Sequence, residues 1–381
     1  MTVDKNSVRR INAVSYLAMA TLGMYLSAYQ YALADITAEF SLYAWASGLL
    51  IAMHFAASFF IPPAAGEIAD RVGRKPVLLA CFGLMAAGIL CAALSRSIVL
   101  LALGALITGG AANTIESSMS SLLSQCNPDE EPRVMNLSQM YFCGGAVLSP
   151  LYGALLARFG LDWRVIYATD ILIALVGGAI VAQTSLPAAP PRGKGLYFGR
   201  ILRRPFYLLM LAGMFLYVGI EESAAFWSGT YAQMAGEGIE SALLAVYWFG
   251  MGAGRLLVSR VKRRLGLITI AGLALSAVSF GVMLAFRSAA AFLVCYALAG
   301  FAVAPAWPML MVGAGKAGSD VPDTAAGGVM AAGSAGGMLI PFFLGLVQTA
   351  AGLRASFALL AAIVVLEAVL LGFSREFRQN L

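Results

Sequence analysis

Three glutamates stand inside long apolar stretches of this sequence, where a carboxyl group is costly to place. Glu221 and Glu222 are neighbours in "YVGIEESAAFW", and Glu116 lies in "NTIESSMSSLLSQ". A charged side chain at the centre of a bilayer costs about 2.5–3.5 kcal/mol on insertion scales, so such residues normally face a wet cavity or a partner. We therefore predict that Glu116, Glu221 and Glu222 take up and release protons. The alternative for each is a hydrogen bond that only joins two helices.

The two adjacent glutamates are expected to point in different directions. Successive residues of an α-helix lie about 100° apart, so both side chains cannot point squarely at one cavity. We expect Glu221 to face a cavity and Glu222 to face a neighbouring helix. Asp35, Asp170 and Glu367 fall nearer to helix ends or late in the last helix, and we expect them to reach water by snorkelling.

Composition defines the setting of these acids. The chain has 381 residues, of which 60% are hydrophobic and 12% charged, whereas soluble domains carry about 25% charged residues. Apolar runs of about 20 residues, enough to cross a hydrocarbon core, recur along the whole chain. The first run lacks a cleavage site for a signal peptidase. The sequence thus predicts an all-α, polytopic membrane protein.

Enzymatic and metal-dependent functions are not indicated. The five cysteines show no CxxC or Cys/His spacing, and the single histidine, His54, makes most intramembrane hydrolases unavailable. "VGAGKAG" (Val312–Gly318) fails the P-loop template, because Ala317 replaces the required Ser or Thr. We expect no cofactor and no metal, and a carrier driven by an ion gradient.

The apolar runs predict twelve membrane helices in two sets of six. The expected ranges are 13–35, 44–65, 76–95, 98–123, 133–157 and 165–186, then 206–233, 241–262, 267–286, 289–313, 323–350 and 354–373. The polar, Pro/Gly-rich stretch from Ser185 to Pro205 resists helix formation. We therefore divide the chain into an N-terminal bundle (1–186), a cytoplasmic linker (187–205) and a C-terminal bundle (206–381).

The positive residues predict the orientation. With a cytoplasmic N-terminus, most of the 25 Lys and Arg, Arg255 among them, fall on the cytoplasmic side. The exceptions on the outer side are Arg96, Arg158, Arg164, Arg287 and Arg354. This is the bias that the positive-inside rule describes. We expect a multi-pass protein of the inner (plasma) membrane with both termini in the cytoplasm. The net charge of +6 then reflects topology and indicates no nucleic-acid partner.

The segment "GEIADRVGRKP" (Gly66–Pro76) is predicted to form a tight, charged cytoplasmic turn between the second and third helices. Its G-x-x-x-D-R-x-G-R-K pattern resembles the signature loop of the major facilitator superfamily, and the helix count and linker position resemble that superfamily over the full chain. The resemblance implies two pseudo-symmetric six-helix bundles that alternate access to a central site. It also implies a gating motif made of Gly66, Asp70, Arg71, Gly73 and Arg74.

Four further stretches resemble the fucose/galactose/glucose:proton symporter family within that superfamily. They are "YVGIEESAAFW", "MNLSQMYFCGGAVLSP", "AGFAVAPAWPML" and "GRLLVSR", each in the corresponding helix. The chain departs from fucose-type members where an Asp in the first helix and a Glu in the fourth are usual. Gln30 and Asn113 stand at these positions, and Glu116 follows one turn after Asn113. The coupling acid is therefore expected at Glu116 or Glu221, unless coupling differs.

This resemblance, together with the hydrogen-bonding needs of polyols, predicts a substrate site of amides and aromatic rings. The predicted binding residues are Tyr29, Gln30, Asn113, Asn136, Gln139, Tyr141, Trp227 and Trp307. The predicted function is proton-coupled transport of a small polar solute, a sugar or a sugar-like compound, by a monomer in the lipid bilayer. The alternative is a proton-coupled efflux antiporter for drugs or amphipathic metabolites. "GGAVLSPLYG" (Gly144–Gly153) is close to the helix 5 motif of such antiporters.

Overall fold

The computed structural model describes residues 5–186, 201–236, 238–318 and 322–380. Within these ranges the side chains of residues 5, 63, 66, 67, 70–72, 322–324, 326 and 380 are not described. The first group of described helices is α1 (Lys5–Glu39), α2 (Ala44–Val72), α3 (Arg74–Ala93), α4 (Ile98–Cys126), the 3-10 turn Pro128–Glu130, α5 (Glu131–Arg158) and α6 (Arg164–Gln183). The second is α8 (Pro205–Phe226), α9 (Ser228–Ala232), α10 (Glu240–Val258), α11 (Leu265–Ala285), α12 (Ala289–Val303), α13 (Ala306–Ala317), α14 (Pro322–Ala351), α15 (Leu353–Phe373) and α16 (Arg375–Asn380).

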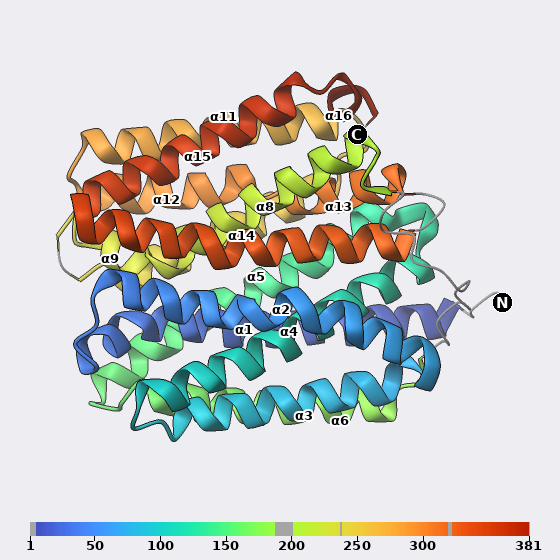
Figure 1. Cartoon of the computed structure of the whole chain (residues 1–381), viewed down its shortest axis with the longest axis horizontal. Helices are drawn as coiled ribbons and strands as arrows, with labels where there is room; N and C mark the ends of the chain where they lie inside the picture. The colour runs from blue at the N-terminus through green and yellow to red at the C-terminus, as the bar shows by residue number, and fades with distance from the viewer. Residues whose placement is uncertain (1–4, 187–200, 237, 319–321, 381) are drawn as a thin grey trace.

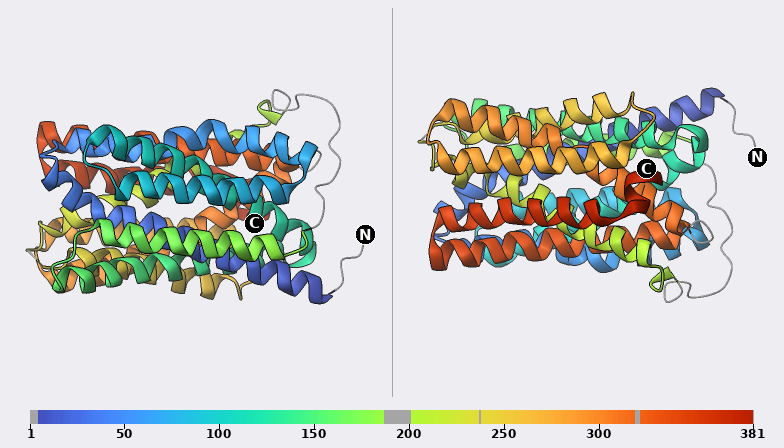
Figure 2. Two further views of the ribbon diagram at one scale, coloured as in Figure 1. Left: turned by 90° about the horizontal axis from the view of Figure 1, so that it is seen from below. Right: turned by 90° about the horizontal axis from the view of Figure 1, so that it is seen from above.

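Twelve spans of the described chain are long and apolar enough to cross a membrane, so the prediction of an all-α, twelve-helix membrane protein is confirmed. The helices run along a common direction, with α1–α6 in one half of the molecule and α8–α15 in the other (Figure 1). The start of α1 and helix α16 lie at the same end of the bundle, as the two turned views also show (Figure 2).

Two of the expected membrane helices are interrupted. The span predicted at 289–313 consists of α12 and α13, and Pro305 comes directly before α13. Proline lacks a backbone N–H and so cannot donate the hydrogen bond that would continue the helix, which accounts for the break. The span predicted at 206–233 is divided into α8, which ends at Phe226, and the short helix α9.

The predicted turn at 66–76 is shorter than expected. Helix α2 continues to Val72, and only Gly73 separates it from α3. Gly73 has φ of 92° and ψ of 154°, a conformation that residues with a Cβ rarely adopt. The side chains of Asp70 and Arg71, like the environment of Gly66, lie outside the described set. Arg74 donates to Gln125 Oε1 at 2.7 Å and to Ser121 Oγ at 3.2 Å, both on α4.

The halves meet mainly where α2 packs on α14 and α5 packs on α10, with smaller contacts that include α1 with α8 and α5 with α13. Small residues allow the backbones to approach closely there. An added Cβ at Gly48 would lie 3.0 Å from the Cα of Phe342, and one at Gly252 would lie 3.0 Å from the Cβ of Cys143. The boundary predicted between the bundles falls largely on residues 187–200, outside the described ranges, and stays a prediction.

Corresponding contacts within the halves show their pseudo-symmetry. In the first half a Cβ at Gly109 of α4 would collide with the carbonyl oxygen of His54 on α2. In the second half a Cβ at Gly300 of α12 would collide with the carbonyl oxygen of Tyr247 on α10. The second and fourth spans of each half therefore pack through the same glycine contact.

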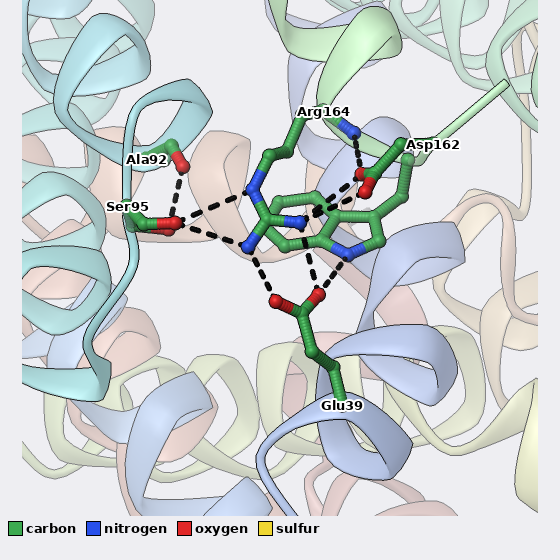
Figure 3. Close-up of polar contacts among 6 residues, drawn as sticks. Glu39, Ala92, Ser95, Asp162 and Arg164 are labelled. Carbon is green, nitrogen blue, oxygen red and sulfur yellow. Dashed lines mark hydrogen bonds and ion pairs between the residues drawn. The ribbon is translucent and has the colours of Figure 1, made fainter.

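A polar cluster joins three elements of the N-terminal half at the end of the bundle away from α16 (Figure 3). Arg164 Nη2 lies 2.6 Å from Glu39 Oε1, and Nη1 lies 3.0 Å from Asp162 Oδ2. Arg164 also donates to the carbonyl oxygen of Ser95, and Trp163 Nε1 donates to Glu39 Oε2 at 2.9 Å. This cluster links the ends of α1 and α3 to the start of α6.

Two acids expected to reach water are buried instead. Asp170 on α6 is 2% exposed and Glu367 on α15 is 0% exposed. Both face the bundle interior because their positions coincide with the buried stripes of α6 and α15. Snorkelling was therefore the wrong expectation for these two residues, whereas Asp35 is exposed as expected.

Candidate functional site

A small cavity, of about 50 Å³, lies between the two halves. The first half contributes residues of α1, α2, α4 and α5, and the second contributes residues of α8, α13 and α14. Its polar lining is formed by Tyr25, His54, Asn113, Glu116, Gln139, Glu221, Glu222 and Ser334. Its apolar lining includes Leu22, Leu26, Phe55, Phe142, Met214, Val218, Trp307 and Met330.

Glu221 forms a buried ion pair at one wall of this cavity. Its Oε1 lies 2.9 Å from Arg255 Nη2, with side-chain exposures of 9% and 1%. The Tyr217 hydroxyl also donates to Glu221 Oε1, at 2.8 Å. The sequence counted Arg255 among the positive residues of the cytoplasmic side; it lies in the last turn of α10 and is fully buried, which the sequence analysis did not predict.

Arg255 also reaches across to the other half of the protein. Its Nη1 donates to the carbonyl oxygen of Gln139 at 3.2 Å and to Cys143 Sγ at 3.1 Å, both on α5. The guanidinium therefore connects Glu221 on α8 to the seam between α5 and α10.

Glu222 makes a separate link between the halves. Gln30 Nε2 on α1 donates to Glu222 Oε2 at 3.0 Å, and Trp248 Nε1 on α10 donates to Gln30 Oε1 at 2.9 Å. All three side chains are buried. The expectation that Glu222 turns away to a neighbouring helix was incomplete, because Glu222 contacts α1 and also lines the cavity. The α8 residues that line the cavity, Met214, Val218, Glu221 and Glu222, span an arc of about 100°, so the two glutamates border it from opposite edges of one helical face.

Glu116 lies on the wall formed by the first half. Gln139 Nε2 of α5 donates to Glu116 Oε1 at 2.9 Å. Asn113, one turn earlier on α4, also lines the cavity, and its Nδ2 donates to the carbonyl oxygen of Gly109 at 3.2 Å. The polar stripe of α4 thus reaches the space between the halves.

His54 also belongs to the cavity wall. Its Nδ1 lies 3.3 Å from the Tyr25 hydroxyl, and its ring lies near those of Tyr29 and Phe55. His54 and Tyr25 were not among the predicted substrate-binding residues. A lone histidine without a neighbouring acid in the sequence gives no signal for such a role.

The predicted substrate-binding residues divide into two groups. Asn113, Gln139 and Trp307 line the cavity, and Gln30 donates a hydrogen bond to Glu222 in the cavity wall. Tyr29, Asn136, Trp227 and Tyr141 are not among the residues that line it.

Each of these four side chains has another environment. Tyr29 packs edge-on against Phe226, Asn136 donates to the carbonyl oxygen of Pro132, and Trp227 donates to that of Pro341. Tyr141 is 43% exposed and stacks on Tyr16, so its ring faces outward from the bundle. The aromatic residues of α1 and α5 thus include packing and surface positions that the sequence pattern does not distinguish from cavity positions.

A bundle of twelve membrane-crossing helices around a central polar cavity defines a membrane carrier. The model of the Major Facilitator Superfamily matches residues 13–320, and the chain belongs to this family of transporters.

Known proteins similar to this chain are transporters. Among curated sequences, the multidrug resistance protein MdtH of Shigella dysenteriae serotype 1 (strain Sd197) is 28% identical over 158 residues, which cover 40% of this chain. The match spans 39% of the length of MdtH.

Two solved structures share the fold over nearly the whole chain. The human organic anion transporter MFSD10 (TETRAN) has a TM-score of 0.74 at 18% identity, covering 96% of this chain and 99% of its own. A variant of the E. coli fucose:proton symporter FucP has a TM-score of 0.70 at 16% identity, covering 98% of this chain and 99% of its own.

Proposed function

We propose that this transporter carries a small polar solute, a sugar or a sugar-like compound, in symport with protons by alternating access. The observation that carries this proposal is the composition of the cavity wall. Amide and carboxyl groups from both halves converge there: Asn113, Glu116 and Gln139 from the first, and Glu221 and Glu222 from the second. Groups that both donate and accept hydrogen bonds suit a hydroxyl-rich solute.

Glu116 and Glu222 are the proposed proton-coupling groups. Each receives a hydrogen bond from a neutral glutamine amide, whereas Glu221 is paired with a guanidinium. A buried carboxylate without a cationic partner is costly, so these two side chains are suited to take up a proton when the cavity closes. Because Glu222 bonds to Gln30 of the other half, its protonation state would affect the seam directly.

The remaining expectations belong to the same proposal. The bundles 1–186 and 206–381 would rock as units about the central site, with residues 187–205 as a cytoplasmic linker. The motif of Gly66, Asp70, Arg71, Gly73 and Arg74 would lock the gate on the cytoplasmic side. The protein would act as a monomer in the inner membrane, with both termini in the cytoplasm.

A second candidate function is proton-coupled export of amphipathic compounds. The apolar part of the cavity lining favours it, because methionine and aromatic side chains adapt to varied apolar ligands. The similarity to a multidrug resistance protein points the same way. Under this alternative, the carboxyl groups of the cavity would bind a cationic drug instead of a sugar.

Purified protein in liposomes with an imposed pH gradient separates the two functions. Sugars, sugar acids, amino acids and cationic amphipathic drugs are added one at a time while internal pH is followed. Proton influx that accompanies a sugar down its own gradient supports symport. Proton release triggered by an amphipathic drug, with sugars silent, replaces it with export.

Variants then test the proposed coupling groups. Glu116→Gln and Glu222→Gln keep an oxygen that can accept the neighbouring glutamine's hydrogen bond but remove the titratable group. We expect each to lose pH-driven accumulation. Glu130→Gln, at a carboxyl whose side chain is 58% exposed, is the matched control and should accumulate solute like the wild type. Unchanged accumulation in both cavity variants would contradict the proposed coupling.

A further inference from the structure

Glu367 is a buried acid that the proposed transport cycle does not use. It lies on α15, outside the cavity, on the same buried stripe as Leu360, Val364 and Leu371. Its side chain is 0% exposed, and neither carboxyl oxygen has a hydrogen-bond partner within the described part of the chain. Buried polar groups are nearly always hydrogen-bonded, so this carboxyl group requires an explanation.

Packing places Glu367 behind the ion pair of the cavity wall. Leu371, one turn further along α15, has its Cδ2 atom 3.3 Å from the position that a Cβ at Gly213 of α8 would occupy. Since α8 and α15 run in opposite directions, Glu367 lies level with the next turn of α8, which contains Tyr217. Residues 213, 217 and 221 share one helical face, so Glu367 lies on the side of α8 that carries Glu221.

On the other helices that pack on α15, the charged side chains among the described residues are Arg375, Glu376 and Arg378 of α16, and all three are exposed. Within the described residues, α11 (Leu265–Ala285) contains no ionisable side chain, and neither does α14 from Gly327 to Ala351. Helix α9 contributes Tyr231, which packs on Phe357 near the opposite end of α15.

The ionisable groups around Glu221 complete the cluster. Glu221 contacts Tyr217 on α8 and Arg255 on α10, and it shares the cavity wall with Glu222 and Glu116. Arg255 also bonds to Cys143 on α5, and Tyr247 is a further ionisable group on α10. The one cation among them, Arg255, already bonds to Glu221. Of the two acids Glu221 and Glu367, only Glu221 is therefore paired with a cation among the described residues.

Charge balance then indicates which of the two carries a proton. A second carboxylate without a partner would cost several kcal/mol to bury, whereas a protonated acid is neutral and supplies its own donor. We propose that Glu367 is a proton-binding site of this carrier, separate from the cavity, and that it holds a proton while Glu221 is paired with Arg255. The link to transport rests on the proposed function, in which the proton is the coupling ion.

The proton balance of the pair follows from this arrangement. When Glu221 is protonated and separates from Arg255, the guanidinium loses its counter-charge, and Glu367 can release its proton without creating a net charge in the interior. In that exchange the O–H bond at Glu367 breaks and one forms at Glu221. The site would let the second half change its charge arrangement without drawing a proton through the substrate cavity.

Infrared spectroscopy of the protein in lipid tests this site without a substrate or a gradient. The carbonyl stretch of protonated carboxylic acids is recorded as pH is varied. Glu367→Gln should lose one component of that band at neutral pH, and Glu376→Gln, at an exposed acid of α16, should lose none. In Glu221→Gln the Glu367 component should disappear at a lower pH than in the wild type, because a neighbouring negative charge has been removed.

Three results would overturn the proposal. The first is an unchanged neutral-pH band in Glu367→Gln, and the second is a Glu367 component that does not respond to Glu221→Gln. The third is failure of Glu367→Gln to fold, because an amide is the nearest neutral replacement for a protonated acid. Because no solute is involved, failure to find proton-coupled flux would contradict the proposed function and leave this result standing.

Discussion

Removing the guanidinium of Arg255 should destabilise the protein far more than removing both members of its ion pair. Arg255 lies 2.9 Å from Glu221, with both side chains nearly inaccessible. Breaking a buried pair by removing one partner costs about 3–5 kcal/mol, because the other charge stays buried and uncompensated. We therefore expect Arg255→Met to lower the free energy of unfolding by about 3–5 kcal/mol.

The double variant Arg255→Met/Glu221→Met removes the uncompensated charge. It still loses the bonds of Arg255 to Tyr217, Gln139 and Cys143, and neutral hydrogen bonds contribute about 1 kcal/mol each. We expect it to be destabilised by about 1–3 kcal/mol. Removing only Glu221 should also cost about 3–5 kcal/mol, because Arg255 then stays buried without a partner. The two single costs should therefore exceed that of the double variant by about 3 kcal/mol or more.

Reversible unfolding in mixed detergent micelles measures each variant, at several pH values. The cost of Arg255→Met should shrink as pH falls, because a proton on Glu221 can then replace the missing positive charge. Effects of the two substitutions that add within about 0.5 kcal/mol, as for independent sites, would refute the assignment of this pair. A cost that does not change with pH would refute the charge argument.

Three further substitutions test other contacts. Arg164→Lys should lower stability by about 1–2 kcal/mol in thermal unfolding, because lysine cannot reproduce the two-pronged contact with Glu39; stability equal to the wild type would show that the cluster contributes little. Gly109→Ala should destabilise by about 1–3 kcal/mol through its collision with the α2 backbone, whereas Gly83→Ala, with nothing within 4 Å of the added Cβ, should be neutral or stabilising. Equal effects of the two alanines would contradict the packing argument. Trp248→Phe should cost about 1 kcal/mol, because it removes the indole N–H that binds the α1 glutamine; tryptophan fluorescence and unfolding of the same sample check it.

The sequence was sufficient for the fold because hydropathy and length directly determine which segments cross a membrane. The long apolar runs and the signature around Gly73 predicted twelve helices and the superfamily. Helix ends were less predictable. The signature residues before Gly73 continue α2 instead of forming a loop, since only Gly73 has a backbone conformation that ends the helix.

The candidate site was predictable only in part. Glu116, Asn113 and Gln139 were found because polar residues in an apolar helix are costly and usually face a cavity. Arg255 was missed because it lies near the end of an apolar run, where positive residues usually mark the cytoplasmic face. Three apolar residues, Leu256 to Val258, follow it within the same helix, and this is the signal that could have indicated burial.

Contacts between distant segments could not be predicted from spacing. Nothing in the neighbourhood of Trp248 indicates that its indole binds Gln30, since the two are brought together only when the halves associate. The burial of Glu367 was hidden for a similar reason. Its position late in the last helix favoured a side chain that snorkels to water, but the rotation of α15 turns the side chain towards α8.

The close approach of α5 and α10 makes the native Cys143 a means of locking the carrier covalently. A Cβ placed at position 252 would lie 3.0 Å from the Cβ of Cys143, below the range of about 3.5–4.5 Å in disulfides, so α5 and α10 must separate by a few tenths of an ångström to form the bond. Gly252→Cys would therefore create a thiol pair across the seam. Oxidation should tie the two halves together in the arrangement described above, and reduction should release them. One substitution would thus give a reversible chemical switch with which to hold a single conformation for structural study.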